Sequence, residues 1–207
     1  GQNKAEALAF RLSTAWGIPI HAYSRHFSEE GFQSEYHTLT ILLGCVDTTK
    51  ARRSLHKALV HGNARNDSQT WLIDGGNLTT HGQVLIGNVV TDFNPQQSFL
   101  FGNVCQSLPA PALVHPELIR RERRPVSTPQ RSCAELAQAD PQSLTINSII
   151  ASHMADYLLR LIITNDLRRF ATYIDMDTGS ARSLAITPTE LVRVLGLPPA
   201  LSADRSS

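Results

Sequence analysis

The sequence predicts an α/β fold with a doubly wound sheet, in which helices cover both faces of a largely parallel sheet. Short apolar runs rich in β-forming residues, such as 38–46 and 70–73, alternate with segments in which apolar residues recur every three or four positions, such as 3–16. Turn-forming residues separate these runs at short intervals. Strands and helices that alternate this closely are typical of βαβ units.

The first part of the chain predicts a helix over 3–16 and then a short strand over 18–23. The run 38–46 is almost continuously apolar, which is typical of a strand buried on both faces of a parallel sheet, and this places Cys45 in the core. Asp47 follows directly. It is suited either to cap the next helix or to bind a ligand at the carboxyl end of the strand, and the sequence favours neither.

The middle of the chain predicts strands over 70–73 and 82–87, with a turn at 74–77 between them. Residues 107–131 contain several prolines and an arginine run, and we expect them to form an extended crossing loop. The remaining elements are a long, mostly buried helix from Ser143, a β-hairpin over 171–186 and a last helix over 188–195.

We expect one domain, because 207 residues suffice for a single core. The predicted parts are a sheet-and-helix part at 1–106, the crossing loop at 107–131, a closing helix, hairpin and last helix at 132–198, and a disordered tail at 199–207. The chain starts with Gly1, without an initiator Met, where the first predicted helix begins, and we therefore expect it to be part of a longer protein.

Composition argues against several classes of protein. A formal net charge of +1 gives no indication of nucleic-acid or membrane-surface binding. No run reaches the roughly 18 apolar residues of a membrane span, and we expect no secretory signal. The cysteines, 3 in number and widely spaced, argue against a disulfide framework and for a cytoplasmic location. The histidines are scattered without metal-ligand spacing.

Three residues are candidates for chemistry. Lys4 begins a predicted helix, where backbone N–H groups together with a cation suit a phosphate, although a solvated surface lysine is the simpler explanation. Asp47, as a ligand-binding carboxylate, would suit Mg²⁺ beside a nucleotide. Cys133 lies near arginines that would lower its pKa and make it a nucleophile, although a lone cysteine is more often inert.

Several segments, taken in order, resemble the ThiF/HesA/MoeB family of ATP-dependent adenylating enzymes, and its PRTRC-associated branch in particular. The segments are Gly1-Gln2-Asn3-Lys4-Ala5, Gly44-Cys45-Val46-Asp47 with Ala51-Arg52-Arg53, Trp71 to Asn77 with Gly82 to Gly87, and Ser132-Cys133 with Ile146 to Ala151. Each motif is loose alone, but their order and spacing make the resemblance fairly specific from Gly1 to about Ile186.

The resemblance implies a Rossmann-like sheet without its first βαβ unit, a crossover loop and a homodimer. It implies adenylation of the C-terminal glycine of a ubiquitin-like or sulfur-carrier protein, with ATP and Mg²⁺ as cofactors. By position, Lys4 would contact the ATP phosphates and Asp47 would bind Mg²⁺. Arg52 would support the nucleotide pocket, and Cys133 would match the cysteine that takes the activated partner in some members.

The chain also departs from the family pattern. The Gly-rich phosphate loop does not occur in it, Thr48 stands where Asn often follows the Asp, and the zinc-binding C-x-x-C pairs are absent. We therefore expect this polypeptide to be inactive alone. One alternative is a non-catalytic relative that dimerises or holds a ubiquitin-like tail. A nicotinamide-dependent oxidoreductase is a weaker alternative, because it gives no reason for Asp47 together with Lys4 and Arg52.

Overall fold

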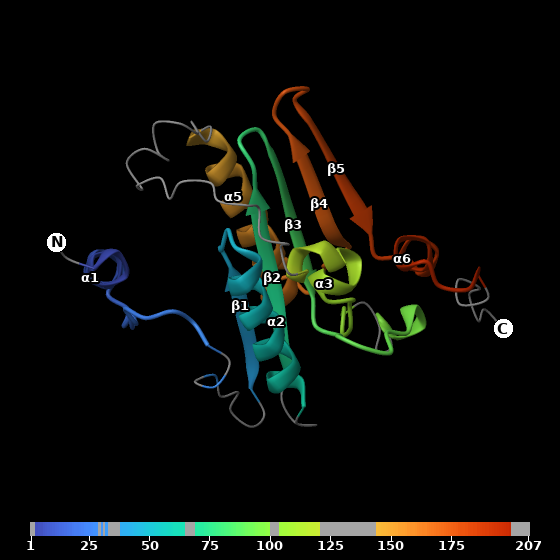
Figure 1. Cartoon of the computed structure of the whole chain (residues 1–207), viewed down its shortest axis with the longest axis horizontal. Coiled ribbons are helices and arrows are strands. Elements are labelled where there is room, and N and C mark those ends of the chain that lie inside the picture. Colours follow the sequence, from blue (N-terminus) through green and yellow to red (C-terminus); the bar gives the residue numbers. More distant parts are fainter. Residues whose placement is uncertain are drawn as a thin grey trace, which may run out of the picture.

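The computed structural model describes residues 3–28, 30, 32, 38–64, 69–99, 104–120 and 144–199. They form an α/β structure with one open five-stranded sheet and helices on both of its faces (Figure 1). In chain order the elements are α1 (Lys4–Trp16), β1 (Leu39–Gly44), α2 (Thr49–Asn63), β2 (Gln69–Asn77), β3 (His81–Gly87), η2 (Pro95–Gln97), α3 (Pro111–Val114), η3 (Pro116–Ile119), α5 (Leu144–Ile162), β4 (Arg169–Asp175), β5 (Ser180–Ala185) and α6 (Pro188–Leu195).

The sheet has the strand order β1-β2-β3-β4-β5. Only β1 and β2 are parallel, with α2 as their crossover, and β2 to β5 are antiparallel neighbours. The predicted α/β class with an open sheet is confirmed, but the expectation of a largely parallel sheet is wrong. The reason is the connection between β2 and β3, because residues 78–80 are too few to form a crossover and can only reverse the chain.

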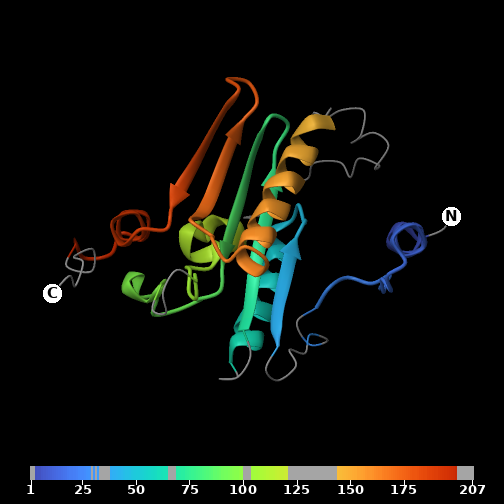
Figure 2. The ribbon, with the colours of Figure 1, turned by 180° about the vertical axis from the view of Figure 1, so that it is seen from behind.

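Each face of the sheet is covered by one long helix. Helix α2 lies over β1 and β2 on the near face of Figure 1, and α5 crosses the opposite face, seen in Figure 2. The buried side of α5 consists of residues at helical spacing, namely Ile146, Ile150, Met154, Tyr157 and Leu161. The predicted helix from Ser143 is thus confirmed, although Leu159 and Ile162 on its other side are exposed.

The N-terminal helix forms as predicted, because its ends carry suitable residues. Asn3 accepts a hydrogen bond from the backbone N–H of Ala5, and Gly17 ends the helix with a φ of 65°. In both views α1 lies apart from the sheet, beyond β1 (Figures 1 and 2). The predicted strand at 18–23 is wrong, because no neighbouring strand pairs with this segment within the described residues.

Strand β1 is less buried than its sequence indicates. It forms one edge of the described sheet, so Leu39 and Leu43 remain 49% and 51% exposed. Cys45 follows the strand and is also exposed, which corrects its predicted place in the core. An apolar run predicts a strand but does not distinguish an edge strand from a central one, because both need the same local conformation.

The side chain of Asn88 fixes the segment that leads to the candidate site. Asn88, just after β3, donates to the carbonyl of Gln106 and accepts from the backbone N–H of Leu108. Val89 and Pro109 then form a parallel bridge.

The predicted extended loop at 107–131 is wrong in part, because α3 and η3 form within it. Residues 121–131 of this predicted loop lie outside the described residues.

The C-terminal elements match the prediction. The hairpin of β4 and β5 turns through Gly179, whose φ is 67°. The Thr187 hydroxyl accepts from the backbone N–H of Glu190, and Gly196 ends α6 with a φ of 63°. Across the described ranges, no helix combines the length and apolar character needed to cross a bilayer.

Candidate functional site

A pocket of about 630 Å³ opens on the α2 side of the sheet. Its floor comes from β2 to β5, and Arg52 of α2 and Glu117 and Leu118 of η3 contribute to its walls. The pocket lies where β2 ends and β3 begins, which is also the carboxyl end of β1, since β1 is parallel to β2. In open α/β sheets this end of the strands is where ligands bind.

Arg52 reaches the pocket while bonded to a buried carboxylate. Its Nε donates to Asp74 Oδ2 at 3.1 Å, and the two side chains are 14% and 3% exposed. Burial raises the pKa of Asp74 above its ordinary value, and the neighbouring Arg52 charge opposes that rise. Asp74 is thus part of the core, and it fixes the direction of Arg52.

Gly76 leaves the space that the Arg52 guanidinium occupies. A Cβ at Gly76 would lie 2.7 Å from Arg52 Nη2, and a Cβ at Gly75, on the other face, would lie 2.4 Å from Met154 Sδ. The turn predicted at 74–77 is therefore wrong. These residues continue β2, and their glycines allow α2 and α5 to approach the strand from both sides.

A chain of three polar side chains crosses the pocket wall. His115 Nδ1 lies 2.8 Å from Glu117 Oε1, and His115 Nε2 lies 2.7 Å from the hydroxyl of Tyr173. A hydrogen bond from its own backbone N–H, with His115 and Arg120 nearby, lowers the pKa of Glu117. Burial raises the pKa of Tyr173, so this tyrosine stays protonated at neutral pH.

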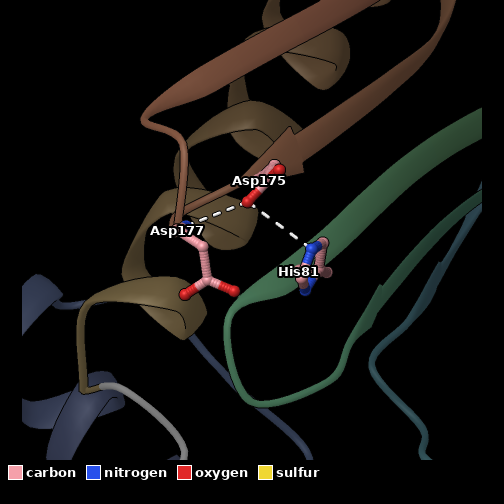
Figure 3. A group of neighbouring side chains, drawn as sticks. All are labelled: His81, Asp175 and Asp177. Carbon is pink, nitrogen blue, oxygen red and sulfur yellow. Dashed lines mark hydrogen bonds and ion pairs between the residues drawn. The ribbon is translucent and has the colours of Figure 1, made fainter.

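His81, Asp175 and Asp177 converge at the hairpin ends, next to the pocket (Figure 3). His81 Nε2 lies 3.5 Å from Asp175 Oδ1. The backbone N–H groups of Asp177 and Thr178 donate to that same oxygen at 2.9 and 3.2 Å, and Thr80 Oγ1 donates to Asp177 Oδ2 at 2.8 Å. Both carboxylates therefore stabilise the turn, and they need no cation for it.

These residues are ones that sequence reasoning missed. The histidines are scattered in the sequence, but β3 pairs with β4 so that His81 lies directly opposite Asp175. Likewise His115 meets Tyr173 only through tertiary packing. The sequence contained a signal for one of these residues, His81. Alternation along the strand places His81 on the same face as Gln83.

Asp47 is exposed between β1 and α2. The helix N-cap is Thr48, whose hydroxyl accepts from the backbone N–H of Ala51 at 3.2 Å, so the capping interpretation of Asp47 is wrong. Among the described residues, no hydrogen-bond or ion-pair partner contacts the Asp47 carboxylate. It is therefore accessible to a ligand at the carboxyl end of β1.

The other predicted site residues lie elsewhere. Lys4 is exposed on α1, which is separate from the sheet, so the structure does not bring it to Asp47 (Figure 1). Cys133 lies outside the described residues. Partial removal from water, together with the Asp74 charge, raises the pKa of the Cys45 thiol, and burial raises the pKa of Cys105 to about 12. Neither of these two thiols is activated as a nucleophile.

No protein-family model and no curated protein matches the chain. Among solved structures, the selenomethionine form of PaaA is similar in part, with 14% sequence identity and a TM-score of 0.49. The match covers 90% of this chain and 56% of PaaA, so the chain spans little more than half of that protein's length.

Proposed function

We propose that the chain contributes part of the site of an ATP-dependent enzyme that adenylates the C-terminal glycine of a ubiquitin-like or sulfur-carrier protein. The observation that carries this proposal is the position of Asp47. Its accessible carboxylate lies at the carboxyl end of β1, shortly before Arg52 and at the same end of the sheet as the pocket. The resemblance to adenylating enzymes assigns Mg²⁺ binding to this residue.

The donor chemistry at Asp47 fits that ion. A single accessible carboxylate is a normal magnesium ligand, because Mg²⁺ in nucleotide sites keeps several waters and takes its other ligands from phosphate oxygens. Bound ATP and Mg²⁺ would supply an α-phosphorus that a carboxylate oxygen attacks with release of pyrophosphate. Asp47 would hold the ion beside that phosphate, where positive charge stabilises the transition state.

The pocket supports a place for the partner's C-terminal segment. Gly76 lets the Arg52 guanidinium lie against the strand floor, and Arg52 and Arg182 supply cations for a terminal carboxylate. Arg52 is already oriented by Asp74, so little side-chain entropy is lost when it binds an anion. In this proposal Arg52 orients the carboxylate that is to be activated.

Replacing Asp47 with Asn tests the proposal. In the complete gene product that contains this chain, we expect ATP–pyrophosphate exchange to fall at least about 100-fold, because the loss of a metal ligand removes several kcal/mol of transition-state stabilisation. The matched control is Asp92→Asn, at another exposed aspartate, which should retain exchange. Normal exchange in a folded Asp47→Asn variant would exclude Asp47 from the reaction.

A second candidate function is a module that binds a protein tail without chemistry. The observation that favours it is that α1, which carries Lys4, lies apart from β1 and α2, which flank Asp47, because a nucleotide site needs both residues together (Figure 1). A hexapeptide ending in glycine distinguishes the two functions. Binding of this peptide to the complete gene product, in the absence of any pyrophosphate exchange, would favour the module.

A further inference from the structure

The hydrogen-bond chain from Glu117 to Tyr173 has a defined direction. Glu117 is an acidic side chain whose pKa is lowered, so at neutral pH it is a carboxylate and can only accept hydrogen bonds. Its partner at 2.8 Å, Nδ1 of His115, must therefore carry a proton. When the imidazole is neutral it has a single N–H, and Nε2 of His115 is then an acceptor. The Tyr173 hydroxyl, 2.7 Å away, then donates its hydrogen to Nε2.

This direction determines what Tyr173 offers to the pocket. A phenol has a single hydrogen, and His115 takes it. Tyr173 lines the pocket with a half-buried side chain, so a ligand group that reaches its hydroxyl oxygen from the pocket would meet only lone pairs. A carboxylate or phosphate oxygen placed against it would face another acceptor, whereas an N–H group would find a partner.

Charged groups on the surrounding elements favour the same direction of hydrogen bonding, from Tyr173 through His115 to Glu117. Arg120 follows η3 and lowers the pKa of Glu117, which keeps the carboxylate ionised. Arg182 of β5 and Arg193 of α6 act on Tyr173 from the other side. Helix α3, which precedes His115, contributes no titratable side chain. Arg120 thus helps to keep Glu117 an acceptor.

We infer that Tyr173 is a specificity-determining residue that accepts a hydrogen bond from a backbone N–H of a peptide in the pocket, and that Glu117 and His115 are positioning residues that prevent it from acting as a donor. The inference rests on the proposed binding of a protein tail and deepens it. It places an amide of the tail at Tyr173 and leaves the terminal carboxylate to the arginines.

The first experiment reads the His115 tautomer directly. In the ¹⁵N-labelled chain at neutral pH, nitrogen chemical shifts distinguish a protonated Nδ1 from a protonated Nε2. We expect protonated Nδ1 in the wild type and a mixture of tautomers in Glu117→Gln, because the amide can donate as well as accept. Glu6→Gln, an equal charge change on the separate helix α1, should retain the wild-type tautomer. A wild type in which Nε2 carries a proton, whether alone or together with Nδ1, would overturn the inference, and this measurement needs no ligand.

The second experiment locates the amide. A hexapeptide ending in glycine is compared with ester analogues that each replace one backbone N–H with oxygen, and binding is measured by NMR titration. In the wild type we expect one ester to bind roughly fivefold more weakly than the peptide, which is the usual effect of one hydrogen bond. Tyr173→Phe should abolish that difference, Glu117→Gln should reduce it, and Glu6→Gln should leave it unchanged.

The outcomes separate the two proposals. If the peptide binds and the ester differences are equal in wild type and Tyr173→Phe, the role of Tyr173 is wrong and the tail-binding pocket stands. If no peptide binds the wild type, both fail. Tyr173 lies on β4 and lines the pocket, and its ring remains in Tyr173→Phe, so the variant tests the hydroxyl and not the packing.

Discussion

At the scale of single residues, the contact between Arg52 and Asp74 shows how burial and charge oppose one another. Removal from water raises the pKa of the Asp74 carboxyl, and the charge and hydrogen bond of Arg52 lower it. Burial is the larger of these effects, so the pKa of Asp74 in the folded chain lies above its ordinary value of 3.8. The folded state therefore binds this proton more tightly than the unfolded state does.

Because the pKa of Asp74 is raised on folding, the effect of Asp74→Asn on stability should depend on pH. A carboxyl whose pKa is raised on folding contributes stability that is fully present below its ordinary pKa of 3.8 and is lost as the pH rises through the folded-state pKa. The asparagine variant lacks this titration. We therefore expect the free energy of unfolding of the wild type, relative to Asp74→Asn, to decrease from acid towards neutral pH. Urea denaturation at several pH values measures it, and an increase would mean that Arg52 outweighs burial.

At the scale of elements, strand glycines set how closely other segments approach the sheet. A Cβ at Gly87 of β3 would lie 2.0 Å from the backbone carbonyl oxygen of Pro109. A Cβ at Gly76 of β2 would instead meet the end of the Arg52 side chain, at 2.7 Å. A backbone carbonyl that is fixed by the bridge from Val89 to Pro109 cannot move aside, whereas an arginine terminus can.

Substitution by alanine should therefore have different effects at Gly87 and at Gly76. Gly87→Ala should lower the free energy of unfolding by about 2 kcal/mol, because overpacking separates β3 from the segment that carries α3 and η3. Gly76→Ala should cost less stability but weaken binding of the glycine-terminated peptide, because it displaces Arg52 in the pocket. Chemical denaturation and NMR titration of both variants check this. Equal losses of stability would contradict the assigned contacts.

At the scale of the whole molecule, the folded core comprises the sheet with α2 and α5, and α1 lies outside it (Figures 1 and 2). Several large apolar side chains of this N-terminal segment are exposed, including Leu8, Phe10 and Trp16. They contribute little to the stability of the core, because apolar side chains stabilise a fold only when they are removed from water.

Deletion of residues 1–28 tests this division. We expect the shortened chain to fold with a free energy of unfolding within about 0.5 kcal/mol of the original, since the described residues of this segment, 3–28, do not belong to the core clusters. The deletion stops before residue 32, because Phe32 packs against the smaller cluster below α2. Urea denaturation of the two chains provides the comparison. A loss of several kcal/mol would show that α1 binds the sheet in solution.

The sequence by itself determined the elements whose signals are local. Helix α6 has its bounds as predicted, because Thr187 caps its start and Gly196 allows the left-handed conformation at its end. The hairpin through Gly179 and the helix that ends at Gly17 follow from the same kind of signal. Such patterns depend on neighbours within a few residues, so one sequence contains all that is needed. The position of Asp47 after a strand was equally visible.

Only the tertiary structure decided the sheet pairing and the pocket. Whether β2 would run on through Gly75 depended on the room that α5 leaves beside it, and the sequence does not contain that distance. The contacts from His115 to Tyr173 and from Arg52 to Asp74 join segments far apart in the chain, and they form because the strands pair in one register. Register and helix placement are settled by the packing of the whole core, which no local pattern specifies.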